Sequence, residues 1–178
     1  MSPKVLAALY AEGTAAFVAR LGFLFEHSPW VVQRAFARGP FADEDDLLGA
    51  AKEVLAAASV TERLALIRAH PELAGKAAIM GALSDASKAE QKGAGLDRLT
   101  PEEFQRLHAL NAAYGARHGF PFIMCVGLSD KTQILAALEA RVPNATAAEI
   151  DTAVAEICKI ARLRLLALPD PAPGEARP

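Results

Sequence analysis

The sequence contains four histidines that could move protons near neutral pH, and His70 has the most informative position among them. It stands directly before Pro71, so the helix predicted to contain it must end there. An imidazole at such a junction can be held in one orientation, as general acid–base catalysis requires. The alternative interpretation is that His70 only hydrogen-bonds the carbonyl groups that end its helix.

Glu90 and Gln91 form a second polar group, in a segment that runs into Gly93 and Gly95. A carboxylate beside such a break could orient a histidine or accept hydrogen bonds from the N–H groups of a substrate. The alternative is a carboxylate on a solvated, charged surface, because lysines flank Glu90 on both sides.

The run Phe120-Pro121-Phe122-Ile123 places backbone polar groups within an apolar wall, which suits a flat heterocyclic ligand. Four apolar residues in a row are equally typical of an ordinary core. Farther along, Arg162 and Arg164 lie on the predicted last helix. An arginine there commonly faces solvent, whereas a buried one would bind a carboxylate through two parallel hydrogen bonds.

Several familiar motifs are absent from the sequence: the HExxH metal motif, cysteine–histidine zinc spacing, the GxGxxG and Walker phosphate loops, and the GxSxG nucleophile elbow. The two cysteines, Cys125 and Cys158, lie far apart and are predicted to be small buried hydrophobes, with a disulfide between them as the alternative. The sequence therefore signals neither a metal site nor an organic cofactor, and it directs attention to acid–base chemistry.

Composition limits the classes of partner. The formal net charge of −2 argues against nucleic acid, which requires a basic face. No apolar stretch is long enough to span a bilayer, and the first residues lack the pattern of a signal peptide. We therefore expect a cytoplasmic protein that interacts with no membrane and binds a small molecule or another protein.

Helix signals dominate the chain, whose 178 residues and 52% hydrophobic content suit one all-α domain. Ser59 with Glu62 predicts a helix ending at His70, and Thr100 with Glu103 predicts one ending near His118. Further helices are expected over 29–36, 43–58, from 71 onward, after Ser84 or Ser87, over 131–141, and over 146–166 with Thr146 and Glu149 as a capping pair. Residues 1–168 should form this helical domain, and the proline-rich tail 169–178 should be disordered.

Several short blocks, taken in order and with their spacing, resemble the family of 2-oxo-4-hydroxy-4-carboxy-5-ureidoimidazoline (OHCU) decarboxylases over roughly residues 17–166. Any one block is weak, whereas their combined order and spacing are specific. The blocks are Glu26-His27-Ser28-Pro29-Trp30, His70-Pro71-Glu72-Leu73-Ala74-Gly75-Lys76, Ser87-Lys88-Ala89-Glu90-Gln91 with Ala94-Gly95-Leu96, Leu110-Asn111, Tyr114, Gly119-Phe120-Pro121-Phe122-Ile123, Glu156-Ile157-Cys158-Lys159-Ile160 and Arg164-Leu165.

The resemblance implies a helical bundle of this family's type, a homodimer, and a reaction without metal or organic cofactor. It implies the decarboxylation of OHCU to (S)-allantoin in urate degradation, a part of purine metabolism. His70 would be the catalytic histidine, Glu90 its acid partner, and Arg164, rather than Arg162, the substrate-binding arginine. The other residues expected to line the substrate pocket are Pro71, Ser87, Gln91, Phe120, Phe122 and Ile123.

Three alternatives belong to other classes. The chain could be a catalytically inert helical module that binds a purine catabolite, a purely structural scaffold, or a partner of the preceding hydrolase of the pathway. A pure binder has no need of a proton-moving pair, so intact His70, Glu90 and Arg164 count against the first alternative.

Overall fold

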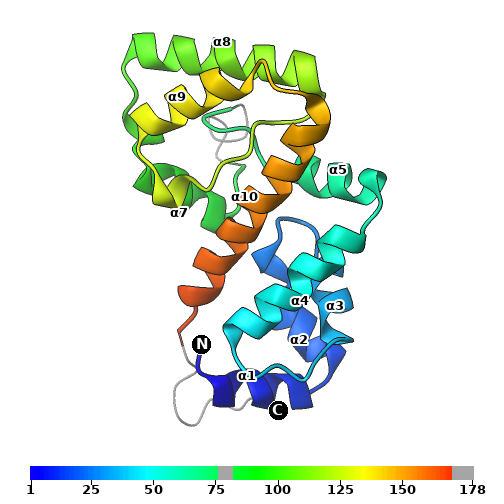
Figure 1. Cartoon of the computed structure of the whole chain (residues 1–178). Coiled ribbons are helices and arrows are strands. Elements are labelled where there is room, and N and C mark those ends of the chain that lie inside the picture. The colour runs from blue at the N-terminus through cyan, green and yellow to red at the C-terminus, as the bar shows by residue number, and fades with distance from the viewer. Residues whose placement is uncertain (76–81, 170–178) are drawn as a thin grey trace. The chain divides into compact units, whose positions relative to one another are not determined.

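The computed structural model describes residues 1–75 and 82–169, and every regular element in this part of the chain is a helix (Figure 1). The predicted all-α class is confirmed, whereas the predicted tail beyond Pro169 lies outside the described residues. The elements are α1 (Pro3–Ala11), α2 (Thr14–Leu21), η1 (Gly22–Leu24), α3 (Trp30–Phe36), α4 (Glu44–Ala57), α5 (Val60–Ala69), α7 (Asp85–Gly93), η2 (Leu96–Arg98), α8 (Pro101–His118), η3 (Val126–Leu128), α9 (Lys131–Arg141) and α10 (Thr146–Leu166), where η marks a 3-10 helix.

Packing divides the chain into two compact units. The first unit contains Met1–Ala58 together with the end of the chain from Ala161, and the second contains Ser59–Ile160. The division falls within α10, so this one helix supplies residues to both units. The single domain expected over residues 1–168 stays a prediction.

Local hydrogen bonds explain where most helices begin. Ser59 and Glu62 form a reciprocal capping box at the start of α5, and Thr100 and Glu103 form another at the start of α8. Each box satisfies backbone N–H groups that the first helical turn leaves without partners. The helix starts predicted from these pairs are confirmed, as is the end of α8 at Gly119, whose φ of 77° suits glycine.

The first unit is organised around aromatic side chains from α1, α2 and α3. The Tyr10 ring stacks on Phe36 with centroids 4.5 Å apart and meets Phe17 edge-on at 6.2 Å. Helices α1 and α2 were not predicted from the sequence. The buried residues of these two helices are Leu6, Phe17 and Leu21. Helix α2 continues through η1 into the turn that carries Glu26.

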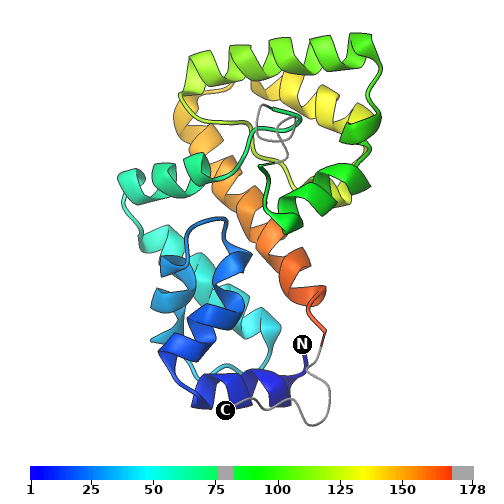
Figure 2. The same cartoon turned by 180° about the vertical axis from the view of Figure 1, so that it is seen from behind.

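The second unit contains α5, α7, α8, α9 and most of α10. Helices α8 and α9, green and yellow in the figures, run side by side in both views (Figure 2). Between Gly119 and η3 no helix forms, so of the two alternatives for Phe120–Cys125 the helical one is wrong, and we refer to these residues as the extended segment. Buried residues of this unit include Leu66, Ile67, Leu107, Tyr114, Phe122, Ile134, Leu138 and Ile157.

Two local predictions are wrong. Residues 71–75 form a turn rather than the expected helix, while residues 76–81 lie outside the described part of the chain. Thr146 and Glu149 are not a capping pair, because α10 begins at Thr146 itself and the Glu149 carboxylate is bound by Tyr114, Arg141 and Asn144. Among the described helices, none is both long and apolar enough to cross a membrane.

Candidate active site

His70 is buried at the end of α5, where its backbone turns from helical to extended geometry. Its Nδ1 lies 2.9 Å from the carbonyl oxygen of Leu66. Because a carbonyl can only accept a hydrogen bond, this contact assigns the ring hydrogen to Nδ1 and leaves the basic lone pair on Nε2. The carbonyl contact anticipated as an alternative to a chemical role is therefore present, and it also selects the tautomer that a proton-transferring imidazole needs.

The turn that follows His70 is held by side chains from two other helices. The N–H of Ala74 donates to Gln91 Oε1 at 2.9 Å, and Asn111 Nδ2 donates to the carbonyl of Leu73 at 3.0 Å. Ala74 has a φ of 49°, a left-handed conformation that is unfavourable for a residue with a Cβ atom. These hydrogen bonds therefore stabilise a strained backbone at Ala74, three residues after Pro71.

Helix α7 carries three of the predicted site residues on one face. Ser84 caps its first turn by accepting from the N–H of Ser87 at 3.3 Å. Ser87, Glu90 and Gln91 are spaced three and four residues apart, so they share a face of the helix. Ser87 and Gln91 are buried and Glu90 is half-buried. Since Gln91 binds the Ala74 backbone, this face lies against the turn after His70.

Glu90 also lies close to the extended segment. Burial, together with the negative charges of Glu156 and Glu90, raises the pKa of the Cys125 thiol to about 11. Glu156 Oε2 accepts a hydrogen bond from the Cys125 N–H at 2.8 Å. Helix α7 contacts η3, which begins directly after Cys125. Glu90 is therefore placed near the end of the segment that contains Phe120, Phe122 and Ile123, all buried.

Eight of the nine predicted site residues belong to the second unit. Arg164 belongs to the first unit, where its Nη2 lies 3.0 Å from Glu26 Oε2 and its Nη1 donates to the Phe23 carbonyl at 3.2 Å. Both side chains of this ion pair are 4% exposed, which agrees with a buried arginine rather than a solvated one. The eight residues of the second unit are His70, Pro71, Ser87, Glu90, Gln91, Phe120, Phe122 and Ile123.

Sequence reasoning assigned no chemical role to Arg141, Glu149 or Glu26. Arg141 and the buried Glu149 form an ion pair at 2.7 Å, in which the Arg141 side chain is 14% exposed. No local pattern marks this pair, because its members lie on different helices. Glu26 did stand in a block of the family resemblance, and that block was the available signal.

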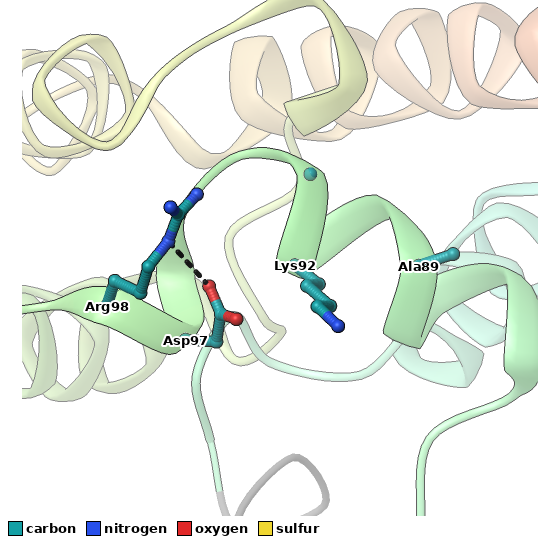
Figure 3. Close-up of a pocket in the computed structure, with 5 residues that line it drawn as sticks. Ala89, Lys92, Asp97 and Arg98 are labelled. Carbon is teal, nitrogen blue, oxygen red and sulfur yellow. Dashed lines mark ion pairs between the residues drawn. The ribbon is translucent and has the colours of Figure 1, made fainter.

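An open hollow on the second unit lies beside the predicted residues but contains none of them (Figure 3). Its polar lining is exposed, with Arg98 Nε 3.6 Å from Asp97 Oδ1 and Lys92 close by on α7. Such charges are solvated, so we do not assign the chemistry to this hollow. In the described residues, no group of three histidine, cysteine or acidic side chains is arranged to hold a metal ion.

Comparison with known proteins identifies the family. The sequence model for OHCU decarboxylase matches residues 11–166, which include the blocks that carry His70, Glu90 and Arg164. The chain belongs to the OHCU decarboxylase family.

Individual members of the OHCU decarboxylase family match most of the chain. The decarboxylase of Haloferax volcanii is 41% identical over 150 residues, covering 84% of this chain and 87% of that protein. The decarboxylase of Halalkalicoccus jeotgali is 38% identical, covering 89% and 88%. A crystal structure of (S)-allantoin synthase is 29% identical with a TM-score of 0.71; the match covers 91% of this chain but only about half, 52%, of that one.

Proposed function

We propose that this protein catalyses the decarboxylation of OHCU to (S)-allantoin in urate degradation, with His70 as the proton-transferring group. The observation that carries the proposal is the orientation of His70, whose Nδ1 is bound to the Leu66 carbonyl so that Nε2 is the basic nitrogen. Membership of the OHCU decarboxylase family supports the choice of substrate.

The chemistry of this substrate requires little from the protein beyond orientation and proton transfer. The carbon that loses carbon dioxide is bonded to the carbon of a C=N group. The electron pair of the broken C–C bond forms a C=C bond to the imine carbon. The π electrons of the C=N group move onto its nitrogen, which takes up a proton. The neighbouring carbon then takes a proton on one face with the C=C electron pair, while the hydroxyl on the decarboxylated carbon loses its proton and becomes a carbonyl; the face that is protonated sets the configuration of (S)-allantoin. The substrate supplies its own electron sink, so the proposal needs no metal and no organic cofactor.

Each predicted residue has a role in this proposal. His70 moves the proton, and Glu90 binds ureido N–H groups of the substrate and tunes His70. Arg164 binds an anionic or carbonyl group of the substrate on the strength of the motif match. The remaining contacts come from Pro71, Ser87, Gln91 and the backbone at Phe120, Phe122 and Ile123.

The test follows the circular dichroism of allantoin formed from freshly generated OHCU, in buffer containing a chelator. We expect a rapid signal of one sign with the unaltered protein. General acid–base catalysis contributes about 10²–10⁴ in rate, so His70→Ala should lose at least that factor. The matched control is His108→Ala, which removes a histidine whose ring centroid lies 4.4 Å from that of Phe104 and which has no proposed role.

Two outcomes would contradict the proposal in different ways. If His70→Ala kept near-full turnover, the mechanism would be wrong even though the activity was present. If the unaltered protein produced allantoin no faster than a protein-free blank, the activity itself would be wrong. A rise in melting temperature with allantoin would then favour the inert module that binds a purine catabolite.

A homodimer and a cytoplasmic location complete the proposal. The dimer is supported by the family resemblance, and sedimentation velocity at several protein concentrations tests it. The cytoplasmic location is proposed together with the metabolic role. Localisation of a fluorescent fusion in the source cell tests it.

A further inference from the structure

The extended segment Phe120–Cys125 poses a problem of hydrogen bonding. Its residues are largely buried, yet the described residues contain no β-strand that could pair with it. Buried backbone N–H and carbonyl groups must nevertheless find partners. Arg141 Nη1 donates to the Ile123 carbonyl at 2.9 Å, and Glu156 accepts from the Cys125 N–H at 2.8 Å. Side chains from α9 and α10 therefore take the place of a neighbouring strand.

Arg141 makes several contacts at once. While Nη1 binds the Ile123 carbonyl, Nε and Nη2 donate to Glu149 Oε2 at 2.9 and 2.7 Å. The guanidinium carbon lies 4.5 Å from the centre of the Phe122 ring. A planar guanidinium can serve a carboxylate, a carbonyl and an aromatic face together, whereas a lysine ammonium cannot reproduce this geometry.

Glu149 completes the network from the start of α10. It has no exposed surface, and its carboxylate also accepts from the Tyr114 hydroxyl at 2.6 Å and from Asn144 Nδ2 at 2.7 Å. Burial acts to raise the pKa of Glu149, but hydrogen bonds from Arg141, Tyr114 and Asn144 outweigh it and hold the pKa below its usual range. Glu149 therefore remains a carboxylate that fixes Arg141.

Tyr114 connects the same network to the aromatic side chains of the segment. Its ring meets Phe122 edge-on at 5.3 Å and Phe120 at 5.9 Å between centroids. Arg141 and Tyr114 together contact Phe120, Phe122 and Ile123, through both backbone and side chains. These are the three residues of the segment that the proposed function places against the substrate.

We infer that Arg141, fixed by Glu149 and Tyr114, is a positioning residue that sets the Phe120–Ile123 segment for substrate recognition. The inference rests on the proposed function, because it assigns the segment a role in that reaction. A substrate that lies in an incorrectly placed pocket presents both faces to the proton donor. Loss of Arg141 should therefore weaken substrate binding and also reduce the enantiomeric purity of the allantoin formed.

The experiment compares Arg141→Met with Arg106→Met, which breaks the exposed Arg106–Glu139 ion pair of the same unit. KM, kcat and the enantiomeric excess of allantoin are measured at a temperature where circular dichroism shows each variant folded. For Arg141→Met we expect kcat/KM to fall about 10²-fold, with higher KM and a lower enantiomeric excess, as for a displacement of about 1 Å. Arg106→Met should match the unaltered protein in all three quantities.

A folded Arg141→Met variant with unchanged KM and enantiomeric excess would overturn the inference. If that variant does not fold, Tyr114→Phe and Arg141→Lys replace it, because the first removes one hydroxyl and the second keeps the positive charge. Both should shift KM and enantiomeric excess in the same direction by a smaller factor. Normal values in both would equally overturn the inference. Failure of the proposed function is distinct, since the unaltered protein would then form allantoin no faster than the blank.

Discussion

Each of the two units contains an arginine–glutamate pair whose carboxylate is buried, and the two pairs differ in what they hold together. In the second unit, Arg141 and Glu149 join a network with Tyr114 and Asn144 that connects α8, α9 and α10 to the extended segment. In the first unit, Arg164 binds Glu26 and thereby ties α10 to the turn after η1. That turn contains a left-handed residue, His27, with a φ of 47°.

The comparison shows two uses of a buried ion pair. Desolvating two charges is unfavourable unless hydrogen bonds satisfy the remaining polar atoms, and the Glu149 carboxylate meets that condition with protein side chains. Arg164, by contrast, is proposed to bind the substrate, so Glu26 has to orient it rather than merely neutralise it. We therefore expect changes in the Arg141–Glu149 network to act on stability as well as on the segment that it holds, and changes in the Arg164–Glu26 pair to act on KM without a comparable loss of stability.

The largest expected effect is that of Glu149→Ala on stability. Removing this fully buried carboxylate leaves Arg141, whose side chain is only 14% exposed, without its ion-pair partner and removes the acceptor of the Tyr114 hydroxyl. Breaking a buried pair in this way should lower the free energy of unfolding by about 3–5 kcal/mol, measured by urea denaturation. The control Glu139→Ala removes an exposed partner of Arg106 and should change it by less than about 1 kcal/mol. Equal effects would mean that burial does not distinguish the two pairs.

A smaller effect, on KM, is expected for Glu26→Gln. The amide keeps an acceptor near Arg164 but removes the charge that orients the guanidinium. We expect KM to rise about tenfold, which corresponds to about 1.4 kcal/mol of binding free energy. The control is Asp45→Asn, which weakens the exposed ion pair between Asp45 and Arg162. Arg162 lies on α10, as Arg164 does, so this change should leave KM unchanged. A normal KM for Glu26→Gln would show that the charge of Glu26 does not orient Arg164 for substrate binding.

The pH dependence of stability sharpens the comparison further. Hydrogen bonds from Arg141, Tyr114 and Asn144 outweigh burial and hold the pKa of Glu149 below its usual value of about 4.3. A lowered pKa contributes stability above the unfolded-state pKa, and that contribution is lost as the pH falls through the folded-state pKa. Melting temperatures between about pH 7 and pH 3 should therefore fall less steeply for Glu149→Gln than for the unaltered protein. Parallel curves would contradict the assigned direction.

The smallest effect is expected in the turn that carries Glu26. Glycine avoids the unfavourable left-handed conformation of His27, worth about 1–2 kcal/mol, but loses more conformational entropy on folding. His27→Gly should thus change the free energy of unfolding by at most about 1 kcal/mol, in the stabilising direction. Thermal melting measures this change. A clear destabilisation would show that the His27 side chain itself supports the turn.

The sequence by itself determined most helix boundaries, because they depend on contacts between neighbouring residues. Ser59 with Glu62 and Thr100 with Glu103 lie three positions apart and cap α5 and α8 as predicted. The sequence also pointed to His70 and Glu90 through the order of short blocks. The structure places them at the end of α5 and on α7, and their chemical roles stay a prediction.

Only the tertiary structure decided what surrounds these residues. Glu149 has the spacing of a capping residue, yet its carboxylate is bound by Tyr114, 35 positions away, and by Arg141 on another helix. The turn after Pro71 was predicted as a helix, but Gln91 and Asn111 hold it in another conformation. Such contacts join residues that are distant in sequence, and no local pattern specifies them. Helix caps depend on a few consecutive residues, whereas buried charges and extended segments depend on partners that only the folded chain brings together.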